Sequence, residues 1–175
     1  MKHYRVIPSP LGEMLLRAED DALTGLYFVG QKYFPQDVTQ AGGAHSPRVL
    51  EESAAQMAEY FAGERQRFTI RLQMTGSPFQ RSVWSELVKI PYGEIESYGR
   101  LAQRLGLPAG SARAVGAANS RNPVSIIVPC HRVISSAGDL TGYAGGLARK
   151  SALLALERPS SAPQQLELLD AELPQ

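Results

Sequence analysis

The sequence predicts an α+β fold, with a small N-terminal domain of one sheet and one helix ahead of a mostly helical C-terminal domain. Three short runs of alternating or continuous apolar residues, at 3–7, 14–16 and 23–29, are typical of strands in a short antiparallel sheet. Apolar side chains follow Pro47 at helical spacing, and beyond residue 77 the strand patterns give way to short helical ones.

The order of these patterns also predicts where the domains begin and end. Residues 68–72 read as one more strand, and the Thr-Gly-Ser sequence after it reads as a linker. We therefore expect four parts: an N-terminal α+β domain at 1–73, a linker at 74–77, a C-terminal domain at 78–158, and a poorly ordered tail rich in Pro, Gln and Glu at 159–175.

Composition limits the classes of protein to consider. The 175 residues are 43% apolar and 20% charged, which is typical of a globular protein, and no apolar run is long enough to span a bilayer. A single cysteine excludes an internal disulfide and a thiolate-rich zinc site, and the three histidines show no metal spacing. We expect a cytoplasmic protein without metal or cofactor and without membrane contact, whose thiol is kept reduced.

Charge is divided unevenly along the chain. Residues 97–150 hold seven basic side chains against one acidic one, a net charge of +6, whereas the rest of the chain carries −5. A basic half joined to an acidic half favours an anionic partner for the basic half, most simply nucleic acid. The alternative is that the charges form only a solvated face.

Two short helices within the basic half form a helix-turn-helix pattern. Residues 98–105 and 111–119 flank a break with two glycines at 106–110. The second helix is almost entirely Ala and Gly, with Arg113 as its only long side chain. Such a helix suits close approach either to the narrow minor groove of DNA or to another helix. Arg113 would pair with a phosphate or insert into the base stack.

The stretch 122–133, NPVSIIVPCHRV, carries the one cysteine. Its β-branched run predicts a buried strand that Pro129 ends, so that Cys130 and His131 sit at the end of a rigid element. Taken alone, a free cysteine is more often a small buried hydrophobe than a nucleophile. Neighbouring side chains of an extended segment also point to opposite faces, so the two residues cooperate only if the chain turns at Cys130 or a water bridges them.

A last helix is predicted over 147–157, and it ends on Glu157. A carboxylate is unfavourable at a helix C-terminus because of the helix dipole, which hints at a specific role there. Glu157 could orient the His131 imidazole, as the third group does in a catalytic triad. Surface glutamates are common enough that a solvated side chain is the alternative.

Several ordered motifs of the second half resemble those of the O6-alkylguanine-DNA alkyltransferases: PCHRV preceded by NPV-x-I-x-V, RAVG-x-AN upstream and GYAGGL-x-RK downstream. The resemblance is strongest over 79–157, while the first domain matches mainly in length and layout. It implies a ribonuclease-H-like N-terminal domain and a monomer that binds double-stranded DNA through the minor groove, with possible cooperativity. It also implies irreversible transfer of one alkyl group, from O6-alkylguanine or O4-alkylthymine, to a cysteine after base flipping.

The resemblance gives each matching catalytic residue a role. Cys130 resembles the alkyl acceptor, His131 the base that deprotonates it through a water, and Glu157 the carboxylate that polarises the imidazole. Asn122 resembles the residue that holds the active-site turn. Tyr98 resembles the tyrosine that donates a proton to guanine N3 as the base leaves.

The resemblance also assigns the DNA-binding surface and the substrate pocket. Arg113 resembles the arginine that fills the stack when a nucleotide is flipped out. The Val133 carbonyl would read the guanine amino group, and Tyr143 would wall the pocket beside Ala144, which stands where some relatives carry a serine. The remaining expected DNA contacts are Ala112, Ala114, Gly116 and Arg132.

Two other functions remain open on the sequence. A binding-only lesion sensor of the same fold would flag alkylated bases for another pathway, although such relatives lack the acceptor cysteine. A cysteine hydrolase acting on a small substrate would need turnover, and it would give no reason for a helix-turn-helix.

Overall fold

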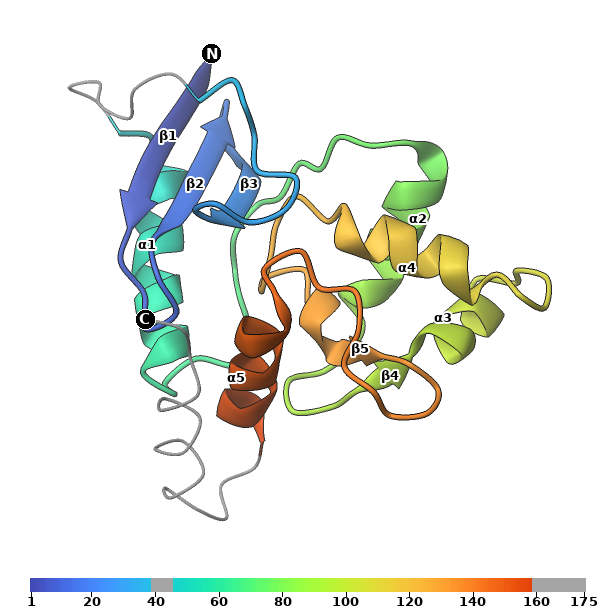
Figure 1. Ribbon diagram of the computed structural model, residues 1–175. Helices are drawn as coiled ribbons and strands as arrows, with labels where there is room; N and C mark the ends of the chain where they lie inside the picture. Colours follow the sequence, from blue (N-terminus) through green and yellow to red (C-terminus); the bar gives the residue numbers. More distant parts are fainter. Residues whose placement is uncertain (39–45, 159–175) are drawn as a thin grey trace. The chain divides into compact units, whose positions relative to one another are not determined.

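The computed structural model describes residues 1–38 and 46–158, so the tail expected at 159–175 lies outside the described residues (Figure 1). The chain divides into two compact units: unit 1, Met1–Thr75 with Pro123–Ser125, and unit 2, Gly76–Asn122 with Ile126–Gln175. The α+β fold predicted from the sequence is confirmed, because a small antiparallel sheet with one helix precedes a mostly helical part.

Unit 1 is a three-stranded antiparallel sheet with one helix, α1 (Arg48–Phe61), packed against it. The strands β1 (Lys2–Ile7), β2 (Met14–Glu19) and β3 (Ala22–Phe28) lie in sequence order, and every residue of β3 is buried. The turn between β2 and β3 has only two residues, and Asp20 adopts φ 52° there, a conformation that Asp tolerates better than most residues.

The strand predicted at 68–72 does not form, and the prediction is wrong. Only an isolated bridge joins Leu72 to Leu23. The Gln56 side chain replaces the missing ladder, because it accepts from Thr69 N at 2.9 Å and donates to Thr69 Oγ1 at 2.7 Å. A side-chain amide from α1 therefore satisfies one backbone N–H, that of Thr69, in a segment that the sequence pattern assigned to a strand.

The buried strand predicted before Cys130 is also wrong as secondary structure. Leu26 N donates to Pro123 O at 2.9 Å and Ser125 N donates to Leu26 O at 3.0 Å, so the chain makes only a brief bridge to β3. Ile126 then adopts φ 73°, which is unusual and strained for a β-branched residue. This kink ends the bridge, and the chain re-enters unit 2 just before the cysteine.

Unit 2 begins with a capped helix that packs on the helix-turn-helix. Ser77 and Gln80 form a capping box at the start of α2 (Pro78–Leu87). Within α2, Trp84 Nε1 donates to Ala118 O at 2.9 Å, which fixes α2 against α4. The other elements are α3 (Tyr98–Arg104), α4 (Ala112–Ser120), α5 (Leu147–Glu157), a 3-10 turn (Cys130–Arg132) and a short parallel pair of β4 (Glu96–Ser97) with β5 (Val133–Ile134).

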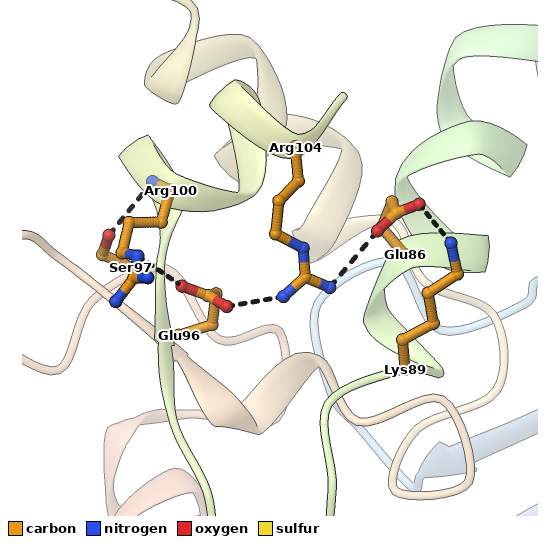
Figure 2. A network of polar contacts seen from close by, with 6 residues as sticks. All are labelled: Glu86, Lys89, Glu96, Ser97, Arg100 and Arg104. Atoms are coloured by element: carbon orange, nitrogen blue, oxygen red, sulfur yellow. Dashed lines mark hydrogen bonds and ion pairs between the residues drawn. The ribbon is translucent and has the colours of Figure 1, made fainter. Parts of the chain in front are cut away.

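A polar network on unit 2 joins α2, β4 and α3 (Figure 2). The Arg104 guanidinium pairs with Glu96 at 2.7 Å and with Glu86 at 3.2 Å, and Lys89 pairs with Glu86 at 2.7 Å. Because the Arg104 side chain is 40% exposed, each pair contributes only about 0.2–1 kcal/mol. The network links α2, β4 and α3, and the stability of unit 2 rests on its apolar core.

We predict that Leu101→Ala, which empties a fully buried position of α3, lowers the free energy of unfolding by about 2–5 kcal/mol. Arg104→Gln, one turn along the same helix, should lower it by less than about 1 kcal/mol. Trp84 is the only tryptophan and lies in unit 2, so its fluorescence during urea unfolding measures this unit directly. Equal losses in the two variants would contradict the assignment of stability to the core.

Candidate active site

The cysteine lies on a tight turn of buried residues. Pro129 leads into the 3-10 turn Cys130–Arg132, in which Cys130 N donates to Val128 O at 2.8 Å. Asn122 Nδ2 donates to the same Val128 carbonyl at 2.8 Å, which ties the turn to the end of α4. The chain therefore turns at Cys130, as cooperation between neighbouring Cys and His side chains requires, and Asn122 lies where the resemblance implies a turn-holding residue.

The Cys130 thiol is neutral in the resting protein. It is 4% exposed, and burial raises its pKa to about 11, although Asn122 and the positive charge of Lys150 act in the opposite direction. A thiol is a weak nucleophile until it loses its proton. The site therefore needs a base that acts during the reaction.

The surroundings of His131 suit the role of such a base. Its Nε2 lies 2.7 Å from Glu157 Oε2, and the side chains of both residues are fully buried. Burial lowers the pKa of His131 despite the carboxylate, so the imidazole is neutral at neutral pH. Because an ionised carboxylate only accepts, Nε2 carries the proton and Nδ1 carries the free lone pair. Nδ1 is buried and has no hydrogen-bond partner among the described residues, so it is open to accept a proton.

Glu157 stays ionised because Arg132 holds it. Arg132 Nε and Nη2 donate to the two Glu157 oxygens at 2.7 and 3.1 Å. Burial acts to raise the Glu157 pKa, but the contacts with His131 and Arg132 together lower it to about 2. Arg132 was expected to contact DNA; it is instead 6% exposed and also donates to Ile90 O at 2.6 Å. Its guanidinium pairs with the buried Glu157 carboxylate and is not on the surface where a phosphate would bind.

Tyr98, at the start of α3, reaches the same region from another element. Its hydroxyl donates to Thr141 O at 3.2 Å, and burial raises its pKa. Asn119 Nδ2 lies 3.4 Å from this hydroxyl and 3.3 Å from Cys130 O. The structure therefore brings Tyr98 and Cys130 together around one buried amide, and it places a phenol that keeps its proton near the thiol.

The expected pocket residues lie on the segment that follows the turn. Tyr143 is buried and Ala144 is half-buried. The Val133 carbonyl, expected to read a guanine amino group, already accepts from Lys150 Nζ at 2.5 Å. A carbonyl oxygen can accept more than one hydrogen bond.

Lys150 is a site residue that the sequence analysis missed. The side chain is fully buried, and Nζ also donates to Thr141 O at 2.8 Å, so it joins β5 to the segment carrying Tyr143. Burial lowers its pKa to about 8. A signal was present: on the predicted helix 147–157, Lys150 shares a face with Leu153 and Glu157, which is an unusual place for an unpaired lysine.

Helix α4 is buried on one face and exposed on the other. Val115 and Asn119 face the interior of unit 2, while Arg113 and Ala114 are exposed. Ala112 and Gly116 are half-buried. The inner face thus packs against its neighbours. The outer face carries small side chains and one long cationic side chain, Arg113, a combination that suits the minor groove.

Comparison with known proteins decides the family. The family model described as the ribonuclease-like domain of 6-O-methylguanine DNA methyltransferase matches residues 2–74, and the model of its DNA binding domain matches residues 78–159. This chain belongs to the 6-O-methylguanine DNA methyltransferase family. The expected resemblance is confirmed, and the chain is a methylated-DNA–protein-cysteine methyltransferase by family.

Relatives of this methyltransferase cover nearly its whole length. The methylated-DNA–protein-cysteine methyltransferase of Mycolicibacterium paratuberculosis is 50% identical over 170 residues, covering 97% of this chain and all of the relative. The constitutive Bacillus subtilis enzyme is 43% identical, covering 91% and 98%. A crystal structure of Mycobacterium tuberculosis OGT in complex with DNA matches with a TM-score of 0.84 at 44% identity, covering 98% of both chains.

In the part of the chain that the structure describes, there is neither a metal-binding cluster nor a membrane-spanning helix. No group of three or more His, Cys, Asp or Glu side chains there is arranged to hold a metal ion. None of the helices described is both long enough and apolar enough to cross a membrane.

We predict that Cys130, tested without DNA, reacts with iodoacetamide at a rate that still climbs about tenfold per pH unit between pH 8 and 9.5, because only the thiolate reacts and its pKa is about 11. A cysteine peptide with the ordinary pKa of 9.0 should begin to level off in this range. Mass spectrometry measures the rate without background, since the chain has one cysteine. A plateau below pH 8 would contradict a neutral resting thiol.

We predict that Glu157→Gln destabilises unit 2 by about 3–5 kcal/mol at neutral pH, because it leaves the buried Arg132 charge unpaired. The Glu157 pKa of about 2 lies below the ordinary 4.5, so its stabilisation is present above pH 4.5 and is lost as the pH falls towards 2. Stability of the variant should thus fall less steeply in this range. Urea unfolding at a series of pH values measures both effects, with the exposed Glu94→Gln as the control; identical pH slopes would refute the assignment.

Proposed function

We propose that this protein repairs O6-alkylguanine in DNA, and also O4-alkylthymine, by moving the alkyl group to Cys130 Sγ once per molecule. The observation that carries the proposal is the arrangement of the turn: a single buried thiol next to an imidazole whose Nδ1 is free and whose Nε2 is held by an ionised carboxylate. That arrangement generates a thiolate only on demand, within a family named for transfer to cysteine.

The proposed chemical step is a displacement at the alkyl carbon. His131 Nδ1 takes the Cys130 proton through a bridging water, and the imidazolium that forms is stabilised by Glu157. The thiolate forms an S–C bond as the bond from the alkyl carbon to guanine O6 breaks. Tyr98 gives a proton to guanine N3, so that a neutral base leaves, and the phenolate recovers a proton from the imidazolium. The thioether product is stable, and nothing in the site regenerates the thiol.

The target base must leave the duplex before it can reach a buried thiol, at a cost of a few kcal/mol. We place the outer face of α4 in the minor groove, with Arg113 filling the gap in the stack. Exposure of Arg113 and the small side chains beside it support this role. The remaining lone pair of the Val133 carbonyl would accept from the guanine amino group.

The setting of the protein follows from its single-use thiol. Cys130 has to stay reduced until it meets a lesion, which suits the cytoplasm. We propose that it acts on DNA as a monomer, since all the reacting groups come from one chain and no cofactor takes part in the step.

We predict that mass spectrometry after mixing with a duplex carrying one O6-methylguanine will find one methyl group on the Cys130 peptide, and that repair stops at one lesion per protein. Cys130→Ala should bind the duplex and repair nothing. Repair by that variant would refute the proposal. Tight lesion binding by the wild type with an unmodified thiol would indicate a sensor, and multiple turnovers on a thioester would indicate a hydrolase.

We predict that Arg113→Ala slows methyl transfer from duplex DNA about ten- to hundredfold, the equivalent of one stacking contact of about 1–3 kcal/mol. Transfer from a single strand should change little, because an unpaired base needs no filler. Arg121→Ala, which removes the same charge at the other end of α4, is the matched control and should slow both substrates modestly and equally. If Arg113→Ala slowed methyl transfer equally on duplex and single-stranded substrates, Arg113 would contribute only its charge.

A further inference from the structure

The buried amide of Asn119 lies among the reacting groups, and the proposed chemistry gives it no role. Asn119 is on the inner face of α4 and is 1% exposed. Its Nδ2 faces Cys130 O at 3.3 Å and the Tyr98 hydroxyl at 3.4 Å. The backbone carbonyl can only accept, so the NH2 end must point towards it and the orientation of the amide is fixed.

The other end of this amide is unsatisfied. Asn119 Oδ1 is buried and has no hydrogen-bond partner among the described residues. Buried polar atoms in native proteins nearly always have partners, and those that lack one need an explanation. Oδ1 can be satisfied only by a donor, so the site is missing an N–H or O–H at this point.

The chemistry of the two proposed lesions identifies which base supplies that donor. Alkylation at O6 removes the proton from guanine N1, so the exocyclic amino group is the only donor on the O6-alkylguanine ring. O4-alkylthymine carries no ring donor. The amino group also stands next to N3, the atom that the Tyr98 hydroxyl would protonate. A base whose N3 accepts from the Tyr98 hydroxyl therefore places its amino group beside Asn119, whose side chain already contacts this hydroxyl.

We propose that Asn119 sets a preference for alkylated guanine over alkylated thymine, by accepting a hydrogen bond at Oδ1 from the exocyclic amino group of the flipped base. This inference rests on the proposed function and adds substrate selection to it. A site with an acceptor left unpaired by the wrong substrate discriminates far better than one relying on shape alone. Asn119 Nδ2 at the same time keeps the Tyr98 hydroxyl and the Cys130 carbonyl in place.

The test compares three duplexes that differ only in the lesion: O6-methylguanine, O6-methylhypoxanthine, which lacks the amino group, and O4-methylthymine. The readout is the rate of methylation of Cys130. For the wild type we expect transfer from O6-methylguanine to be at least about tenfold faster than from O6-methylhypoxanthine. In Asn119→Leu, which keeps the size and removes the amide, this ratio should fall by about three- to tenfold, because loss of the Nδ2 contacts slows all three lesions alike whereas loss of Oδ1 slows only guanine.

Three results would overturn the inference. The first is an unchanged guanine-to-hypoxanthine ratio in Asn119→Leu. The second is equal slowing of that variant on all three lesions, which would indicate only a positioning effect through Tyr98. The third is a wild type with no preference for guanine. Ser120→Ala, on the same helix, should leave all ratios unchanged. If Asn119→Leu does not fold, judged by Trp84 fluorescence, the guanine-to-hypoxanthine ratio is measured with Asn119→Ala in its place. A wild type that methylates Cys130 from no lesion would instead refute the proposed function.

Discussion

The buried Glu157 carboxylate, shared between His131 and Arg132, is the interaction on which the rest of the site depends. Burying a charge at a helix C-terminus is doubly unfavourable, from desolvation and from the helix dipole. Arg132 offsets both costs with two hydrogen bonds to the Glu157 carboxylate, and it also donates a hydrogen bond to Ile90 O. What the protein gains is a single geometry: α5 and the 3-10 turn are joined, and the imidazole is held in one tautomer with Nδ1 free.

This arrangement explains why a reactive site can rest in an unreactive state. Burial keeps the Cys130 thiol protonated and the His131 imidazole neutral, so the charges appear only when a proton moves between them. A preformed thiolate would be open to oxidation and to stray electrophiles. For a nucleophile that acts once, as proposed, such side reactions are irreversible losses. In the proposed step, the ionised Glu157 would stabilise the imidazolium when it forms, without activating the thiol beforehand.

The sequence predicts those parts of the molecule that depend on local patterns. Apolar spacing places α1 and α5, and the Ser77-Pro78 pair marks the start of α2. The predictions that fail concern features that local patterns do not determine. The run before Cys130 has the pattern of a strand, but the backbone bends at Ile126. The strand β4 is too short to leave a pattern. The role of Arg132 is equally hidden, because Glu157 lies 25 residues away and an arginine in a basic half reads first as a DNA contact.

Helix α4 shows how the two tasks of the proposed reaction can be coupled. Arg113 lies on its exposed face near the first turn, and Asn119 lies on its buried face near the last. Extrusion of the base and reading of the base would then be performed by one rigid element, held against α2 by the Trp84 bond to Ala118 O. A site on a regular element is more precise than one on a loop. In the proposed complex, small side chains would let the outer face of the helix approach DNA, and on the inside a Cβ at Gly116 would lie 3.8 Å from the Tyr98 ring, an ordinary contact distance.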